Sequence, residues 1–329
     1  MKMKKWMLVL LLVILAALLG MAMWLNGGEE ATVENAGQAV HAPQKQISLT
    51  YHGEEYPLKE HLRTFLLIGT DSVEHYEKKE NLLQDYYNYN QADFLMLMVQ
   101  DTEANTTEVI QLNRDTMTDV PWLDVIGNYG GTEFQQICLA FNYGDGGRAS
   151  CLNTVDAVSM LLFDAPIQHY IQIPMSAIPV LNNLVGGVPV EIPVDMTDVD
   201  PAFVEGTTVY LTGDQAEKFV RARRILEDDT NSARMSRHRI YLESFQKQAQ
   251  KAFDSESEFA MKLVEKLGEY MQTDLTAQQL SNLMQSLDQS RILPIRTAEG
   301  ELIVGTQQYY EFFVDEASLW EIVKQAYCK

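Results

Sequence analysis

Arginines are concentrated in one short stretch of a chain that is otherwise strongly acidic. Six of the eleven arginines fall within residues 221–239, RARRILEDDTNSARMSRHR, although the formal net charge is −21. A guanidinium group is rigid, permanently charged and matched to phosphate oxygens, so this stretch predicts an anion site. The alternative is a solvated helix face whose arginines pair with carboxylates. Arg234, Arg237 and Tyr241 recur at i, i+3 and i+7 and so share one helix face, which favours the anion site.

A second set of charged residues stands where predicted strands begin or end. The set comprises Asp71, Asp93, Arg114 and Asp115. Taken alone, each residue is weak evidence for a functional site, because an Arg-Asp pair such as Arg114-Asp115 is more often a salt-bridged turn and an aspartate such as Asp93 is more often a strand cap. Together with Arg221 and Arg223 they suit phosphoryl transfer, in which carboxylates hold Mg²⁺ (or Mn²⁺), the metal bridges phosphate oxygens and arginines neutralise the remaining charge.

The elements that must position these residues form an α/β pattern. Apolar runs predict buried strands at 64–69 and 93–101, and the segments 108–112 and 169–174 are also expected to be strands. Helical spacing of apolar residues predicts helices at 147–163 and 231–253. Two prolines confine the run 188–194 to an edge strand. Charged residues at several strand ends then meet at one edge of the sheet, the usual place for a site in this class.

The first thirty residues predict a membrane anchor. Three lysines precede residues 6–25, a run of twenty residues without charge, which as a helix rises about 30 Å and spans the hydrocarbon core. Lysines before the span place residues 1–5 in the cytoplasm and the rest of the chain outside the cell membrane. A cleaved signal peptide is the alternative. Residues 26–60 read as a linker.

Overall composition excludes one class of partner. The sequence pI is about 4.6. Binding of nucleic acid draws its affinity from a basic surface that releases counterions, so nucleic acid is not expected as a partner.

The cysteines and the C-terminal segment complete the sequence predictions. Cys138 and Cys151 flank a Gly-rich turn and would lie outside the membrane, so they are candidates for a disulfide, with two buried free thiols as the alternative. Residues 255–329 read as a mainly helical appendage without obvious chemistry. Its expected elements are helices at 258–272, 276–288 and 315–327 and a small strand pair near 291–304.

Six motifs, in this order and spacing, resemble the LytR-CpsA-Psr family of exported cell-wall enzymes. They are LLIGTDS (66–72), the strand that opens at Asp93, RDT (114–116), LVGGVPVEIP (184–193), LTGDQAEKFVRAR (211–223) and RMSRHR (234–239). The resemblance covers residues 64–253. It implies a three-layer α/β/α sandwich with a central mixed sheet over 61–254 and an apolar groove for a polyprenyl tail.

The resemblance also implies an activity and roles for residues. It implies a magnesium-dependent phosphotransferase that moves a glycopolymer from a polyprenyl-pyrophosphate carrier onto peptidoglycan. Asp71 and Asp93 are expected to hold the metal, and Asp115 to orient Arg114 or act near the acceptor. The residues expected to clamp the pyrophosphate are Arg114, Arg221, Arg223, Arg234 and Arg237, and those assigned to catalysis are Arg114, Asp115, Arg221 and Arg223.

The chain departs from the family pattern at several positions. Val73 and Gln91-Ala92 stand where arginine-containing sequence is usual, Asn113 replaces a proline, and His238 replaces a glutamine. Two positive charges near the first loop are therefore missing. These departures leave two alternatives open: a weakened relative that binds polyprenyl-linked glycans, and a polyprenyl-pyrophosphate pyrophosphatase.

Overall fold

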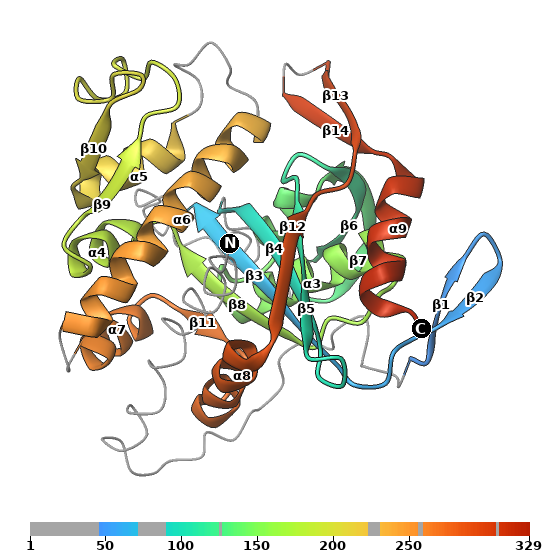
Figure 1. Ribbon diagram of the computed structural model, residues 1–329. Helices are drawn as coiled ribbons and strands as arrows, with labels where there is room; N and C mark the ends of the chain where they lie inside the picture. Colours follow the sequence, from blue (N-terminus) through green and yellow to red (C-terminus); the bar gives the residue numbers. More distant parts are fainter. Residues whose placement is uncertain (1–45, 72–89, 125–126, 223–230, 256–258, 307–308) are drawn as a thin grey trace. The chain divides into compact units, whose positions relative to one another are not determined.

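The computed structural model describes residues 46–71, 90–124, 127–222, 231–255, 259–306 and 309–329 (Figure 1). The chain divides into two compact units, which we describe separately. Unit 1 contains Pro174–Met271 and Leu275–Gln289. Of the described residues, unit 2 contains those from 46 to 173, together with Gln272–Asp274 and Ser290–Lys329. The predicted membrane span 6–25 lies outside the described residues. Among the residues that are described, no helix has the length and apolar character needed to cross a membrane.

Unit 2 is built on a six-stranded mixed sheet. Its strand order is β11-β8-β3-β4-β5-β12, in which β3, β4 and β5 are antiparallel neighbours and β12 runs parallel to β5. The bounds are β3 Leu62–Asp71, β4 Gln91–Asp101, β5 Thr106–Leu112, β8 His169–Pro174, β11 Gln272–Thr273 and β12 Arg291–Arg296. The mixed central sheet predicted from the sequence is thus present.

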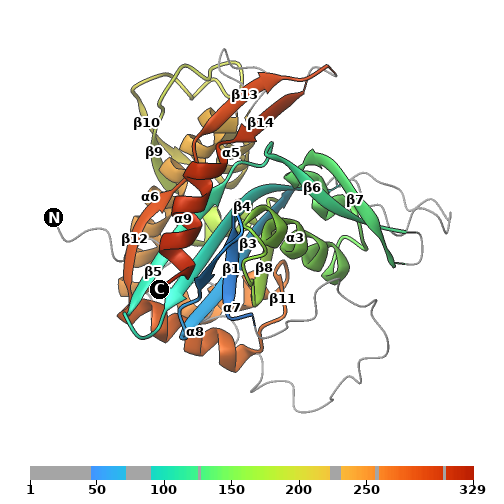
Figure 2. The ribbon, with the colours of Figure 1, turned by 90° about the vertical axis from the view of Figure 1, so that its right-hand side faces the viewer.

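The central strands are buried on both faces, which is why they read as continuous apolar runs. In β3, Leu66 and Ile68 belong to a buried core cluster that includes residues of α3 (Arg148–Leu161) and α9 (Glu316–Tyr327). Figure 2 shows these two helices and the strands of the sheet. Phe65 and Leu67, on the alternate face of the same strand, are also buried. Helices of unit 2 therefore cover one face, and the second helical layer of the predicted sandwich remains a prediction.

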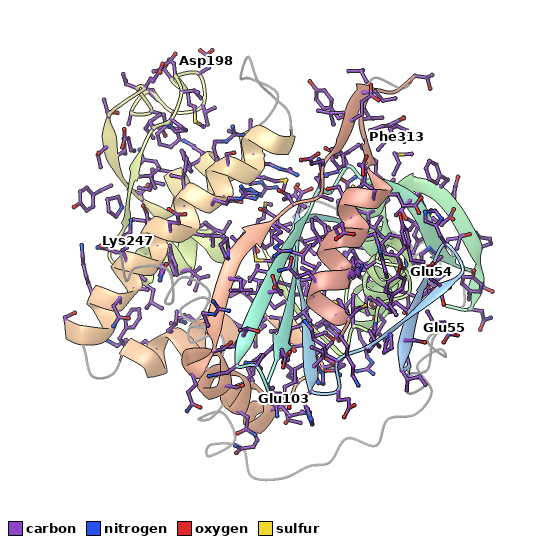
Figure 3. All side chains as sticks on the ribbon, turned by 45° about the vertical axis from the view of Figure 1, so that its right-hand side comes forward. Glu54, Glu55, Glu103, Asp198, Lys247 and Phe313 are labelled. Carbon is purple, nitrogen blue, oxygen red and sulfur yellow. The ribbon has the colours of Figure 1, made fainter. Side chains whose placement is uncertain are left out.

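The segment before the sheet is folded rather than a linker as far as residue 60. Residues 46–60 contain the hairpin of β1 (Ser48–Tyr51) and β2 (Glu54–Pro57), on which Figure 3 labels Glu54 and Glu55. Leu49 is fully buried, and the ring of Tyr51 stacks on Trp320 with centroids 4.4 Å apart. The linker prediction was wrong for these residues, because their apolar side chains contact a distant part of the chain.

The C-terminal segment is divided between the two units and does not form a separate appendage: α7 (Phe259–Gly268) and α8 (Ala277–Gln289) belong to unit 1, and residues 290–329 belong to unit 2. The expected helices form as α7, α8 and α9, but the predicted strand pair does not. Instead β12 joins the central sheet beside β5, and β13 (Gly300–Val304) pairs with β14 (Tyr310–Val314). A boundary at 254/255 therefore does not match the division of the chain into units.

A further hairpin, absent from the sequence predictions, follows β5. Strands β6 (Met117–Leu123) and β7 (Tyr129–Gln136) pair antiparallel and lead into the short 3-10 helix η1 (Ile137–Asn142). The indole of Trp122 lies so close to Gly130 that a Cβ there would come within 2.2 Å of the ring. The glycine is thus required by close packing inside the hairpin.

Unit 1 is mainly helical. Its elements are α4 (Ala177–Leu184), the β9–β10 hairpin (Val188–Glu191, Thr208–Leu211), α5 (Gly213–Arg221), α6 (Asn231–Ser255), α7 and α8. Helix α6 places Tyr241, Phe245 and Ala249 in the core, and α7 places Phe259, Leu263 and Leu267 there. Each set recurs every four residues, the spacing of one helix face.

Candidate functional site

The turn that carries Arg114 is held by backbone hydrogen bonds from two distant segments. The carbonyl of Arg114 accepts from Cys138 N at 3.1 Å, and that of Thr116 accepts from Ile137 N at 2.8 Å. The carbonyl of Asp115 accepts from Phe312 N at 2.8 Å. With these carbonyls satisfied, the turn is fixed between η1 on one side and β14 on the other.

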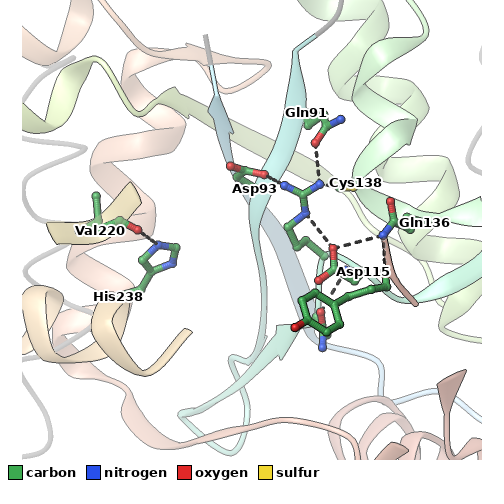
Figure 4. A network of polar contacts seen from close by, with 10 residues as sticks. Gln91, Asp93, Asp115, Gln136, Cys138, Val220 and His238 are labelled. Atoms are coloured by element: carbon green, nitrogen blue, oxygen red, sulfur yellow. Dashed lines mark hydrogen bonds and ion pairs between the residues drawn. The ribbon is translucent and has the colours of Figure 1, made fainter. Parts of the chain in front are cut away.

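The guanidinium of Arg114 is buried among acceptors (Figure 4). Nη1 forms an ion pair with Asp93, Nη2 donates to Gln91 Oε1 at 2.6 Å, and Nε lies 3.2 Å from Asp115 Oδ1. Burial lowers the pKa of Arg114, but Cys138, Asp93 and Asp115 raise the pKa by more, so the group stays charged. One buried cation therefore lies between two carboxylates, and its orientation is set by several contacts.

Cys138 belongs to this cluster as a thiol. Its Sγ accepts from Arg114 Nη2 at 3.0 Å, and burial raises the pKa of the thiol to about 11 although Arg114 lowers it. All three cysteines of the chain are free and buried. The predicted disulfide with Cys151 was wrong: Cys138 packs against Arg114, and Cys151 lies in the first turn of α3 within the apolar core.

Asp93 lies at an irregularity in the sheet. Gly69 pairs with Phe94 and Thr70 with Ala92, so Asp93 is the extra residue of a β-bulge. A Cβ on Gly69 would come within 2.8 Å of Phe94 Cβ, which is why a glycine stands there. The bulge bends β4 at the point where the Asp93 side chain meets Arg114.

Asp71 lies at the same end of the sheet. It is the cross-strand partner of Gln91, and opposed residues of an antiparallel pair share one face. Gln91 in turn accepts from Arg114. The structure thus brings together Asp93, Arg114 and Asp115, adds Gln91 and Cys138, and places Asp71 across the strand pair from Gln91.

The two strand-end carboxylates have the chemistry expected of a shared metal site. In the part of the chain that is described, no group of three or more His, Cys, Asp or Glu side chains could hold a metal by itself. Mg²⁺ is typically bound by one or two carboxylates together with substrate phosphates and water. Asp71 and Asp93 are carboxylates of the kind that this pattern requires, and Asp93 also forms an ion pair with Arg114.

The arginines of unit 1 divide into two groups. Arg234 and Arg237 are buried on the same face of α6 as Tyr241, so a solvated helix face is wrong for them. Arg237 Nη2 donates to the carbonyl of Ala222, and the ring Nε2 of His238 contacts the carbonyl of Val220 at 3.0 Å. These contacts satisfy carbonyls at the end of α5, a structural role that the sequence did not reveal.

Arg221 lies on α5, a helix that opens with a capping box of Thr212 and Gln215. It is partly exposed and pairs with Glu217 at 2.6 Å, one turn earlier. Arg223 falls outside the described residues, as do Asp228 and Asp229. Because these arginines belong to unit 1 and Arg114 to unit 2, their convergence on one site stays a prediction, and so does the apolar groove between sheet and helix 231–253.

Two glutamines and a thiol around the Arg114 turn were missed by sequence reasoning. Gln136 Nε2 lies 3.4 Å from Asp115 Oδ1 and also donates to the carbonyl of Tyr310. Gln91 was noticed only as a departure from a pattern, although its position two residues before Asp93 on a strand was a usable signal. Gln136 gave no signal, and Cys138 was singled out only as a disulfide candidate, because the contacts of both residues depend on tertiary structure.

The mixed β-sheet is covered by helices on one face and carries a buried cluster of arginine and carboxylates at one end. These features define an α/β protein with a charged site at its strand ends. Residues 22–327 match the model of the LytR_cpsA_psr family, and the chain belongs to that family.

Similar proteins place this membership in context. The chain is 26% identical over 194 residues to the polyisoprenyl-teichoic acid–peptidoglycan teichoic acid transferase TagU of Bacillus cereus (strain AH820), covering 59% of this chain and 55% of that protein. It thus spans about half the length of the curated relatives it matches. Two solved structures share the fold. Protein gbs0355 of Streptococcus agalactiae has a TM-score of 0.61 at 19% identity, with 80% and 87% of the chains covered. TagT bound to LI-WTA has a TM-score of 0.58 at 17% identity, with 81% and 90% covered.

Proposed function

We propose that this protein transfers a glycopolymer from a polyprenyl-pyrophosphate carrier to peptidoglycan. The observation that carries the proposal is the buried Arg114 cluster at the sheet end, in a chain of this family. The name of the TagU relative describes a transfer of this kind, and TagT has been solved with LI-WTA bound. The chemistry requires charge stabilisation rather than a covalent protein intermediate, which suits a site whose described groups are a guanidinium, carboxylates, glutamine amides and a buried thiol.

Arg114 supplies positive charge where negative charge develops on the transferred phosphate. Its contacts to Asp93, Gln91 and Asp115 fix the guanidinium before substrate arrives. A preorganised charge of this kind does not have to reorient during the reaction, which is why such groups contribute strongly to rate. Asp115 is a positioning residue in this scheme, held by Gln136 on its outer side.

Asp71 and Asp93 are the proposed ligands of Mg²⁺, with Mn²⁺ as the alternative. When bound, the metal would neutralise charge on the pyrophosphate oxygens. The arginines of unit 1 proposed for the pyrophosphate are Arg221, Arg223, Arg234 and Arg237. A lipid-linked donor implies work at a membrane, so the proposal includes a single-pass anchor at 6–25 and a catalytic part outside the cell.

The test follows magnesium-dependent release of polyprenyl phosphate by the purified full-length protein supplied with a lipid-linked glycopolymer and peptidoglycan. We expect Asp93→Ala and Arg114→Lys each to lower the rate by about 10²–10³. Arg63, an exposed arginine of the same sheet, provides the matched control, and Arg63→Ala should keep the rate.

Other outcomes decide between the alternatives. Full activity in both variants would place the chemistry elsewhere. An unmutated protein that retains lipid without transferring polymer would indicate a carrier-binding relative. Release of polyprenyl phosphate that does not require peptidoglycan would indicate a pyrophosphatase.

A further inference from the structure

Exposed apolar side chains gather on two hairpins of unit 2. Phe134 on β7 is 58% exposed, and Phe313 on β14 and Ile303 on β13 are each 39% exposed. Phe313 is labelled in Figure 3. The rings of Phe134 and Phe313 lie 6.4 Å apart at 36°. Exposed aromatic side chains next to one another are uncommon on a surface that has no partner. We call Phe134, Phe313 and Ile303 the aromatic surface.

The aromatic surface is continuous with the Arg114 cluster. Phe312, next to Phe313, bridges to Thr116 and donates from its backbone to the Asp115 carbonyl. Phe134 lies two residues from Gln136, whose amide contacts the Asp115 carboxylate. Alternate residues of a strand share a face, so Phe134 and Gln136 are separated by only about 7 Å along β7.

The charge around this surface restricts what can bind there. Residues 115–147 and 297–323 contain five and six acidic residues, respectively, and no Lys, Arg or His. Asp119 is the cross-strand partner of Phe134, and Glu301 that of Phe313, so each ring has a carboxylate directly across from it. Within these two stretches, a phosphate-bearing polymer or an anionic lipid surface would meet only side chains of like charge.

An uncharged sugar chain fits both features. A hexopyranose ring has an apolar C–H face that can pack on an aromatic ring, and hydroxyl groups that can donate to carboxylates, which only accept when ionised. The transfer proposed above needs two substrates of different charge: an anionic donor near arginine, and an acceptor that presents a sugar hydroxyl.

We propose that Phe134 and Phe313, with Asp119 and Glu301, form the surface on which the sugar chain of the acceptor lies. The inference rests on the proposed transfer for the identity of the acceptor. Phe313 follows Phe312, which donates to the Asp115 carbonyl, and Phe134 lies two residues from Gln136, which contacts the Asp115 carboxylate. Among the described residues, neither ring forms a cation–π contact with Arg114.

The experiment measures binding of an uncharged N-acetylglucosamine oligosaccharide to the full-length protein by titration calorimetry, without donor. We expect the double variant Phe134→Ala/Phe313→Ala to bind about tenfold more weakly or worse, because both ring contacts are lost. Phe134→Tyr/Phe313→Tyr keeps both rings and should bind as the unmutated protein does. Tyr210, 67% exposed on unit 1, supplies the control, and Tyr210→Ala should leave binding unchanged.

Each remaining outcome counts against the surface. It is refuted if the unmutated protein does not bind the sugar, or if the double alanine variant binds it normally. The double alanine variant could instead lose self-association, or binding to a lysine-rich peptide, while it still binds the sugar. Either result would assign the surface to another partner. The binding experiment contains no donor, so its result holds even if the protein is found not to transfer polymer. If transfer is observed but the sugar does not bind, the proposed surface is refuted and the proposed transfer is not.

Discussion

Replacing Arg114 with methionine tests whether the cluster is held by a buried charge. The change removes the guanidinium, keeps a side chain of similar length and leaves Asp93 and Asp115 facing each other without a cation. The side chains of Arg114, Asp93 and Asp115 are only 6%, 9% and 1% exposed, so solvent screens the loss very little.

The magnitude follows from this burial. Removing one partner of a buried ion pair typically costs about 3–5 kcal/mol, because the remaining charge is left uncompensated. A domain has a total free energy of unfolding of about 5–15 kcal/mol, so Arg114→Met should remove a large fraction of the stability of unit 2. Asp93→Asn keeps an acceptor for Arg114 and should cost less, about 1–3 kcal/mol.

The assay is urea unfolding followed by tryptophan fluorescence, with Trp6 and Trp24 replaced by phenylalanine. The remaining Trp122 and Trp320 both lie in unit 2, so the signal reports on that unit. The double variant Arg114→Met/Asp93→Asn should lose an amount of unfolding free energy that differs from the sum of the two single losses, since the residues are in contact. A loss below about 1 kcal/mol for Arg114→Met, or strict additivity, would refute the buried ion pair.

Three further predictions concern the surroundings of the cluster and the end of α5. Gln136→Leu should lower the rate of transfer more than it lowers donor binding, because the Asp115 carboxylate loses an outer contact; equal donor affinity with an unchanged rate would contradict this. Cys138 should resist alkylation in the folded protein, because burial raises the pKa of its thiol from 9.0 to about 11. The stability linked to the protonated thiol should therefore be complete below pH 9 and should decline as the pH rises through 11. Melting temperatures measured across this pH range should decline less for Cys138→Ala. Arg237→Met should lower the melting temperature, since a hydrogen bond to the buried Ala222 carbonyl is lost at a cost of about 1–3 kcal/mol, whereas Arg221→Met should change it little.

Local sequence determined the elements and the types of residue at the strand ends. Apolar runs predicted β3 and β4, because a strand buried on both faces is mostly apolar. β5 and β8 also formed where they were expected, although they bury Glu108, Gln111 and Gln172. Helical spacing predicted α3 and α6 in the same way. The grouping of Asp71, Asp93, Arg114 and Asp115 followed from the rule that charged residues after buried strands meet at a sheet edge.

Tertiary structure decided which distant segments complete the cluster and how its charge is held. No local pattern revealed that β14 binds the backbone of Asp115, that β12 joins the central sheet, or that Cys138 contacts Arg114 rather than Cys151. A disulfide was a reasonable expectation from export and spacing alone, but the direction of each cysteine side chain depends on the element that carries it. The sequence therefore determined which groups are available for chemistry, and the long-range packing of hairpins and helix ends determined their partners, because contacts between distant segments have no periodicity along the chain.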